Sequence, residues 1–456
     1  MSQPRRMKRR DFIKSTAVLS TLAFLPGCGP GEATTEASTP ARLRTAHIGV
    51  GNMGAEDLKA VASHPRVDVT ALCDVDANAL AAALALHPKA KTYSDYRVML
   101  KEMAGEIDAV FVSTPDHTHA PASMLAMENG KPVYCQKPLT HHVTEARAMR
   151  KLAAEKQLIT QMGIQVHSFY DYKLATLLIQ AGIIGKVSSV RAWSNKNWGY
   201  DGPAPEGSDP VPEHLDWNLW LGTAAERPYK EGVYHPGEWR KLLDFGCGTL
   251  GDMGVHIFDT PYNALALDVP TTIKNECRAP TGFGFPENNV VTYEFPGTAY
   301  TTESFQWVWY DGPGVPAEHP DLVLPNGDAL PEQGAMFVGE KGRLLLPHFM
   351  ELPRLIVNGA YEDIDLAMAG EEMANAPVVR DYAGESPKHY HQFVDACLGE
   401  DTTTAPFEYA ARLTETILLG VIAGRFPNQT LHWDNATARF QEEEANTYLD
   451  GTYRSF

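Results

Sequence analysis

The sequence has few cysteines and few basic residues, and each shortage excludes a class of protein. Six cysteines are spread over 456 residues with no two of them separated by two positions, so neither a disulfide framework nor a zinc site is predicted. Acidic residues outnumber basic ones by 57 to 39, and the formal net charge is -18. Such a charge disfavours nucleic acid and anionic membranes as partners, and a neutral small molecule suits the protein better.

Long hydrophobic runs are also lacking. The apolar run Ser15–Leu25 is too short for a comfortable transmembrane helix. It directly follows the basic segment Lys8–Lys14, in which Arg9 and Arg10 form the pair typical of a twin-arginine export signal. We therefore predict an exported protein.

A candidate lipid attachment site follows the export signal. Leu25–Cys28 resembles a lipoprotein cleavage box, although Pro26 departs from the usual pattern. A lipid-anchored protein and a soluble periplasmic protein are both compatible with this segment. Residues 29–42 form a low-complexity tether that has nothing to bury, so residues 1–42 are left out of the fold prediction.

The stretch Arg44–Asp74 predicts a dinucleotide site. An apolar run ends in the glycine turn Gly49-x-Gly51-x-x-Gly54, a helical pattern follows, and a second apolar run stops at Asp74. The glycines permit a tight turn, close approach to a pyrophosphate and close packing of helix on strand. The helix N-terminus attracts phosphate, and the acid accepts hydrogen bonds from a ribose, which favours NAD over NADP.

Apolar strands and helical patterns continue to alternate as far as residue 167. This order predicts a doubly wound parallel sheet, a Rossmann domain over residues 43–167. From residue 168 to 456, period-two segments predict an α+β domain with a large, predominantly antiparallel open sheet and two late helices. Ligands of parallel sheets bind beyond the carboxyl ends of the strands, where residues 49–54, Asp74, residues 114–119 and Lys137 all fall.

Two further stretches carry candidate catalytic groups. Asp252 and His256 are four residues apart after a glycine-rich turn, so on a helix the carboxylate can orient the imidazole as a base. Such a pair lies more often on a solvated helix face. Here the glycine-rich turn before it and the cofactor domain upstream favour a catalytic role. Lys137 follows a buried strand at the cofactor end and can stabilise an alkoxide, while Lys137-Pro138 favours a cis peptide bond.

Four ordered motifs, GVGNMG, STPDHTH, QKP and GDMGVHIFD, resemble the glucose–fructose oxidoreductase / inositol dehydrogenase (Gfo/Idh/MocA) family over roughly residues 44–430. The resemblance implies that Lys137 and His256 are catalytic and that Asp252 binds and orients the substrate. It also implies a substrate pocket, and often an oligomer interface, on the second domain's sheet. Together with the glycine turn and Asp74, the resemblance implies that the cofactor is bound by Gly49, Gly51, Asn52, Met53, Gly54, Asp74, Ser113, Thr114, Pro115, Asp116 and Lys137.

Two positions depart from the family pattern. Gln136 stands where the family usually has a glutamate, so we expect one charged contact beside Lys137 to be lost. Asp116 stands where the family often has an asparagine, which puts that cofactor contact in doubt.

The remaining polar and aromatic candidates lie at strand ends and in a segment rich in Pro, Gly and Trp. Taken alone, each of them could equally well pack in a loop or face solvent instead of binding substrate. Several histidines also occur, but they lack ligand partners at the spacing of a metal site, so no metal is predicted. The candidate substrate-binding residues are Gln165, His167, Asn197, Trp198, Arg240, Asp252 and His256.

These features predict a nicotinamide-dependent oxidoreductase acting on a sugar, sugar derivative or cyclitol, with a cofactor that stays bound. One alternative is an NAD-dependent glycoside hydrolase or lyase that oxidises its substrate transiently without net redox change. Another is a non-catalytic sugar-binding lipoprotein. The fold alone does not decide among these three functions. Assembly as a homo-oligomer through the second domain's sheet is a further expectation from the resemblance.

Overall fold

The computed structural model describes residues 41–378 and 381–456. The predicted export signal, the lipid site at Cys28 and nearly all of the tether lie outside the described residues. None of the described helices is long and apolar enough to span a bilayer.

The first part of the described chain, called the first half or nucleotide half below, forms a six-stranded sheet over residues 43–163. Its neighbouring strands are all parallel, in the order β3-β2-β1-β4-β5-β6. Every residue of β4 and β5 is buried, as expected for strands covered on both faces. The strand order reverses between β1 and β4, and such sheets bind ligands at this switch point. The strands are β1 Leu43–Ile48, β2 Val67–Cys73, β3 Lys91–Tyr93, β4 Ala109–Val112, β5 Val133–Gln136 and β6 Thr160–Gly163.

The helices that connect these strands are α1 Met53–Ala62, α2 Ala77–Leu86, α3 Tyr96–Glu102, α4 Asp116–Glu128 and α5 Val143–Lys156. Helix α4 begins at Asp116, which therefore lies in its first turn.

The second sheet has ten strands in the order β14-β13-β12-β11-β7-β10-β9-β8-β15-β16. It is mixed, because β7 and β10 pair in parallel while the other neighbouring strands are antiparallel. The fold-class prediction is confirmed. The strands are β7 Val187–Ser194, β8 Thr272–Glu276, β9 Asn289–Pro296, β10 Thr301–Asp311, β11 Gln333–Gly339, β12 Gly342–Pro347, β13 Arg354–Val357, β14 Ala360–Glu362, β15 Thr430–Asp434 and β16 Arg439–Phe440.

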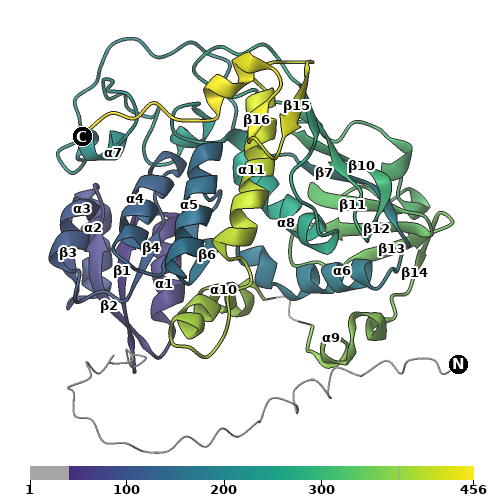
Figure 1. Cartoon of the computed structure of the whole chain (residues 1–456), viewed down its shortest axis with the longest axis horizontal. Coiled ribbons are helices and arrows are strands. Elements are labelled where there is room, and N and C mark those ends of the chain that lie inside the picture. The colour runs from purple at the N-terminus through teal and green to yellow at the C-terminus, as the bar shows by residue number, and fades with distance from the viewer. Residues whose placement is uncertain (1–40, 379–380) are drawn as a thin grey trace, which may run out of the picture. The chain divides into compact units, whose positions relative to one another are not determined.

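Helices cover the second sheet and also join it to the first. In the main core, the ring of Phe258 on α8 stacks on Trp307 of β10 with centroids 4.0 Å apart. Helix α11 packs against α5 of the first half, and the two run side by side in Figure 1. The remaining helices are α6 Tyr170–Gln180, α7 Trp217–Leu221, α8 Val255–Ala264, α9 Glu371–Asn375, α10 Tyr382–Cys397 and α11 Phe407–Ala423.

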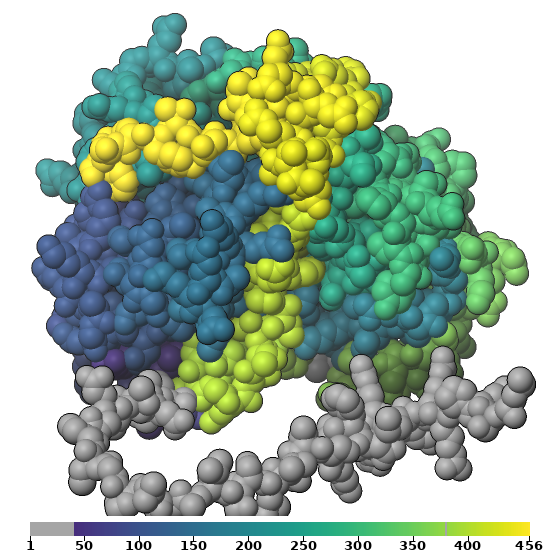
Figure 2. All heavy atoms as spheres, in the orientation of Figure 1, coloured from purple at the N-terminus to yellow at the C-terminus, as the bar shows by residue number. Residues whose placement is uncertain are grey.

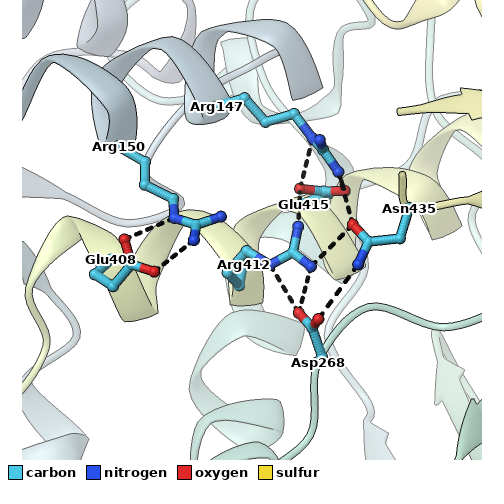
Figure 3. A network of polar contacts seen from close by, with 7 residues as sticks. All are labelled: Arg147, Arg150, Asp268, Glu408, Arg412, Glu415 and Asn435. Atoms are coloured by element: carbon cyan, nitrogen blue, oxygen red, sulfur yellow. Dashed lines mark hydrogen bonds and ion pairs between the residues drawn. The ribbon is translucent and has the colours of Figure 1, made fainter. Parts of the chain in front are cut away.

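The two late helices contact the first sheet or its helices, although the sequence assigned them to the second domain. Tyr390 and Phe393 of α10 pack on Phe111 and Tyr134 of the first sheet. Arginines of α5 pair with acids of α11: Arg147 with Glu415 at 2.6 Å and Arg150 with Glu408 at 2.5 Å (Figure 3). These contacts hold the two halves together behind the site.

Candidate active site

A cavity of about 1070 Å³ lies at the carboxyl ends of β1, β2, β4 and β5. Residues that follow these strands form one side of it. The other side comes from the second half of the chain, through the segment that follows β7 and through residues 252–256 and 348–349.

The glycine turn after β1 shows why its three glycines are needed. Gly49 has a φ of +84°, and a Cβ there would lie 2.5 Å from the carbonyl oxygen of Ser113. A Cβ on Gly54 would lie 2.3 Å from the carbonyl oxygen of Gly49. A Cβ on Gly51 would lie 3.1 Å from Cβ of Ala79 on α2. The turn is therefore as tight as a dinucleotide site requires, and the cavity extends along its exposed side.

Asp74 lies at the end of β2 and lines the cavity. Its carboxylate accepts hydrogen bonds from the backbone N–H groups of Val50 at 2.8 Å and Asp76 at 2.9 Å. Burial raises the pKa of this carboxyl group, and the two N–H groups oppose that shift. Each carboxylate oxygen keeps a second acceptor position for a ribose hydroxyl.

The cations that line the cavity lie at its other end. Lys137 and Arg240 approach Asp252, and Lys196 is close enough to His256 to lower its pKa. No lysine or arginine among the described lining residues lies beside Asp74 to hold a 2′-phosphate, so this end of the cavity fits NAD.

Gln136 takes part in a buried network that the sequence did not reveal. Its side-chain amide donates to both carboxylate oxygens of Asp57, at 2.9 and 3.0 Å. Ser113 and Tyr390 donate their hydroxyl groups to the same carboxylate, at 2.6 and 2.5 Å. An amide at position 136 can donate to this carboxylate, which a glutamate there could not do when ionised. The charge of Lys137 acts weakly on Asp57, and the expected loss of a charged contact beside Lys137 stays a prediction.

Lys137 bridges the two halves of the chain. Its Nζ donates to Asp252 twice, to Oδ1 at 2.7 Å and to the backbone carbonyl oxygen at 3.0 Å. Trp198 donates from Nε1 to the other carboxylate oxygen at 2.6 Å, and Nε of Arg240 lies 3.4 Å from Oδ1. Burial acts to raise the pKa of Asp252, but the two cations outweigh it and the pKa is lowered. Lys137-Pro138 is a cis peptide bond.

His256 stands in the first turn of α8, directly after a π-helical turn over Leu250–Gly254. Burial, followed by the charge of Lys137, lowers the pKa of its imidazole. Within the described part of the chain, its Nδ1 has no hydrogen-bond partner. Among the described residues no hydrogen bond joins Asp252 to His256, and the carboxylate accepts from Lys137 and Trp198 instead, so its orienting role stays a prediction.

His348 is a second histidine at this end of the cavity. Its ring centroid lies 6.0 Å from that of His256, and its Nδ1 is hydrogen-bonded to the hydroxyl group of Tyr172. Burial, with smaller effects of Lys196 and Lys137, lowers the pKa of His348 to about 3. Its place directly after β12 is the one sequence signal that would have identified it.

Three of the other candidates line the cavity, and two lie elsewhere. Gln165, Trp198 and Arg240 line it. His167 does not, because its Nδ1 bonds at 2.9 Å to Asp259, one turn beyond His256 on α8. Asn197 does not either, since its side-chain oxygen accepts the backbone N–H of Gly199 at 2.9 Å and caps the loop.

Asp116 begins α4 and lines the cavity between its two ends. Burial raises the pKa of this carboxyl group to about 7, against the opposing charges of Arg240 and Lys137. The other predicted cofactor residues, Asn52, Met53, Thr114 and Pro115, line the same cavity. Within residues 41–378 and 381–456, no group of three or more His, Cys, Asp or Glu side chains is placed to hold a metal ion.

A doubly wound sheet with this glycine turn, a buried acid at the end of β2 and a cavity over the switch point defines a dinucleotide-binding protein of the dehydrogenase type. Comparison with protein families gives the family itself. Residues 43–164 match the Gfo/Idh/MocA model described as an oxidoreductase family with an NAD-binding Rossmann fold. Residues 173–285 match the model of the same family's C-terminal α/β domain. The chain belongs to the Gfo/Idh/MocA family, and its residues 43–164 are an NAD-binding Rossmann domain.

Curated relatives match only part of their own length. Levoglucosan dehydrogenase of Pseudarthrobacter phenanthrenivorans is 26% identical over 36% of this chain and 34% of its own. Inositol 2-dehydrogenase of Salmonella typhimurium is 29% identical over 32% of this chain and 43% of its own. A glycosyl hydrolase family 109 protein of Stenotrophomonas maltophilia is 34% identical over 28% and 29%. The chain thus spans less than half the length of each of these relatives.

Solved structures match over most of the chain, at identities that show the fold alone. An oxidoreductase domain protein from Kribbella flavida has a TM-score of 0.61 and 22% identity, covering 86% of this chain and 99% of its own. Levoglucosan dehydrogenase in complex with NADH and levoglucosan has a TM-score of 0.60 and 15% identity, with coverage of 86% and 99%.

Proposed function

We propose that the protein is an NAD-dependent oxidoreductase that transfers hydride between the cofactor and a hydroxyl-bearing carbon of a sugar, sugar derivative or cyclitol. The observation that carries the proposal is the meeting of the two halves in one cavity. Lys137 from the nucleotide half and His256 from the second half both line it, and Lys137 is bonded to Asp252 at 2.7 Å. Relatives named levoglucosan dehydrogenase and inositol 2-dehydrogenase support this substrate class.

The proposed chemistry uses groups already in position. His256 is neutral near pH 7 because its pKa is lowered, so its imidazole can accept the hydroxyl proton of the substrate. Lys137 keeps a third N–H beyond the two that it donates to Asp252, and this donor stabilises the developing alkoxide. The bound nicotinamide supplies the hydride acceptor. The C–H electron pair leaves as hydride and a carbonyl forms.

We further propose that the cofactor stays bound through successive turnovers and is recycled in the site by a second sugar, which fits export to a compartment where free NAD is scarce. The segment after β7 contacts the ribose end of the cavity, where His214 and His235 line it and both bond to Asp76 at 3.0 Å. Purified protein should therefore retain nucleotide through gel filtration. Protein that loses its nucleotide in this step contradicts the proposal.

The test of the redox reaction is a panel of neutral sugars, sugar derivatives and cyclitols incubated with purified protein. We expect one class to reduce the bound cofactor, followed by its absorbance, and mass spectrometry to find the substrate lighter by two hydrogens. A panel that leaves the cofactor oxidised throughout contradicts the proposal.

A second candidate is glycoside hydrolysis by the same groups. Transient oxidation acidifies the neighbouring C–H, the glycosidic bond breaks by elimination, water adds, and hydride returns. The similarity to a glycosyl hydrolase family 109 protein favours considering it. Release of the phenol from an aryl glycoside, with no net cofactor reduction, would select this function. Binding of sugars with neither signal would select the non-catalytic sugar-binding protein.

Export by the twin-arginine route, with or without a lipid at Cys28, belongs to the same proposal and rests on the sequence pattern. Replacing Arg9 and Arg10 by lysine should retain the protein in the cytoplasm. The homo-oligomer expected through the ten-stranded sheet is tested by light scattering of the purified protein.

A further inference from the structure

Residues 449–456 cross from the second half of the chain to the nucleotide half. The backbone N–H of Thr144 on α5 donates to the carbonyl oxygen of Leu449 at 3.1 Å. Tyr453 donates its hydroxyl group to Glu145 at 2.9 Å, and the backbone N–H of Arg454 donates to Thr223 at 3.0 Å. Figure 2 shows this segment in yellow, passing over the blue helices of the Rossmann domain.

The segment brings Phe456 to the edge of the cavity. Phe456 lines it together with Ser94, Asp95 and Tyr96 at the end of β3. The guanidinium carbon of Arg97 lies 4.0 Å from the centroid of the Phe456 ring, and Arg97 also donates to the carbonyl oxygen of this residue. The ring is therefore held at a defined place.

Arg97 is itself fixed, so it acts as a rigid support. Asp95 accepts its Nη2 at 2.7 Å and its Nε at 2.9 Å, a two-point ion pair. Arg454 donates to the side-chain and backbone oxygens of Asn218, each at 2.8 Å, and its guanidinium carbon lies 5.8 Å from the centroid of the Phe456 ring, farther than that of Arg97. The position of Phe456 is thus determined by contacts from both α3 and the segment around α7.

This part of the cavity is the adenosine end. Strands β2 and β3 are neighbours, and Asp74 at the end of β2 marks the ribose position. The cations and histidines of the proposed reaction lie at the opposite end, around Asp252. Phe456 therefore lies at the end of the cavity where the base of a bound dinucleotide is expected.

We propose that Phe456, supported by Arg97, provides the face on which the adenine base of NAD stacks, so that residues 449–456 form part of the cofactor site. The inference rests on NAD binding and deepens the proposal of a retained cofactor. Every base has a flat π-face that an aromatic side chain can cover, and a cation behind the aromatic ring strengthens the arrangement. The base is then held by a residue from outside the Rossmann domain.

The test compares Phe456→Ala with the wild-type full chain, stripped of nucleotide, in equilibrium titrations with NADH and with reduced nicotinamide mononucleotide, which lacks adenosine. We expect the variant to bind NADH more weakly by roughly tenfold or more, the usual weight of one base–aromatic stack. Binding of the mononucleotide should stay unchanged. Trp220, which lines the same cavity, serves as a fluorescence donor to the reduced nicotinamide.

Tyr448→Ala is the matched control, because Tyr448 is an aromatic residue near the same segment that packs on Arg425 and does not line this cavity. It should bind both ligands as the wild type does. Phe456→Leu keeps apolar volume without the flat face, so it should lose less affinity than the alanine variant.

Three results would overturn the inference: unchanged NADH affinity in Phe456→Ala, an equal loss for both ligands, or a wild type that binds both ligands equally well. No substrate takes part in these titrations. A failure of the proposed hydride transfer therefore leaves their outcome untouched, and the two proposals are tested separately.

Discussion

Gln136→Glu should destabilise the protein, because it places a second carboxylate against Asp57. The substituted oxygen would stand where Nε2 of Gln136 now lies, 2.9 Å from the Asp57 carboxylate. Two unit charges about 3 Å apart repel by roughly 5 kcal/mol at an effective dielectric constant of about 20. The substitution also removes the two hydrogen bonds that the amide donates.

The protein can avoid most of this repulsion by keeping one of the two carboxyl groups protonated. Holding a carboxyl group protonated costs about 1.4 kcal/mol for each pH unit above its usual pKa, so we expect a net loss of about 2–4 kcal/mol near neutral pH. Burial already raises the pKa of Asp57, which places the penalty toward the lower end of this range.

The loss should depend on pH with a defined sign. A carboxyl group whose pKa is raised in the folded state binds more protons folded than unfolded, so stability falls as pH rises above its unfolded pKa. The deficit of Gln136→Glu relative to wild type should therefore be larger at about pH 8 than at about pH 5.

Denaturant unfolding of the wild type, Gln136→Glu and the exchanged pair Asp57→Asn/Gln136→Glu, each at both pH values, measures the effect. The exchanged pair restores one carboxylate and one amide, so it should recover much of the lost stability. A Gln136→Glu protein as stable as wild type at both pH values would refute the account of this network.

Three further predictions concern other buried charges. Lys137→Ala should abolish turnover while nucleotide stays bound, measured by activity and by released nucleotide; full activity would mean that another group stabilises the alkoxide. The folded-state pKa of Asp116, about 7, lies above its unfolded value, so Asp116→Asn should remove a loss of stability between about pH 4 and pH 7 in pH-dependent unfolding. Glu415→Ala removes the buried carboxylate that pairs with both Arg147 and Arg412 and should cost roughly 2–4 kcal/mol in unfolding free energy, whereas Glu408→Ala at the exposed pair should cost under about 1 kcal/mol.

The parts of the site that lie close together in sequence were predictable. The turn Gly49–Gly54 and Asp74 belong to one strand–helix–strand unit, in which steric limits on the backbone allow few alternatives. The ends of parallel strands share one edge of a sheet, so Asp116 and Lys137 were placed beside that turn without coordinates. The order and spacing of the strands along the chain were enough to predict this arrangement.

The contacts between distant segments were not predictable in the same way. The sequence alone indicates only that Gln136 lacks the charge of the family's glutamate. Its hydrogen bond to Asp57, which also accepts from Tyr390, is visible only in the structure. His167 stood at a strand end that suggested the cavity, yet it bonds to Asp259. No local pattern distinguishes these outcomes, since each depends on which side chain of a distant element occupies the facing position.

The sequence by itself determined the Rossmann domain, its preference for NAD and the edge of the sheet at which the cavity lies, because these follow from backbone geometry within short segments. Only the tertiary structure decided that Lys137 bonds to Asp252, that His348 faces His256 and that Phe456 reaches the adenosine end. Such contacts join segments far apart along the chain, and their geometry is set by packing of the whole molecule rather than by any local pattern.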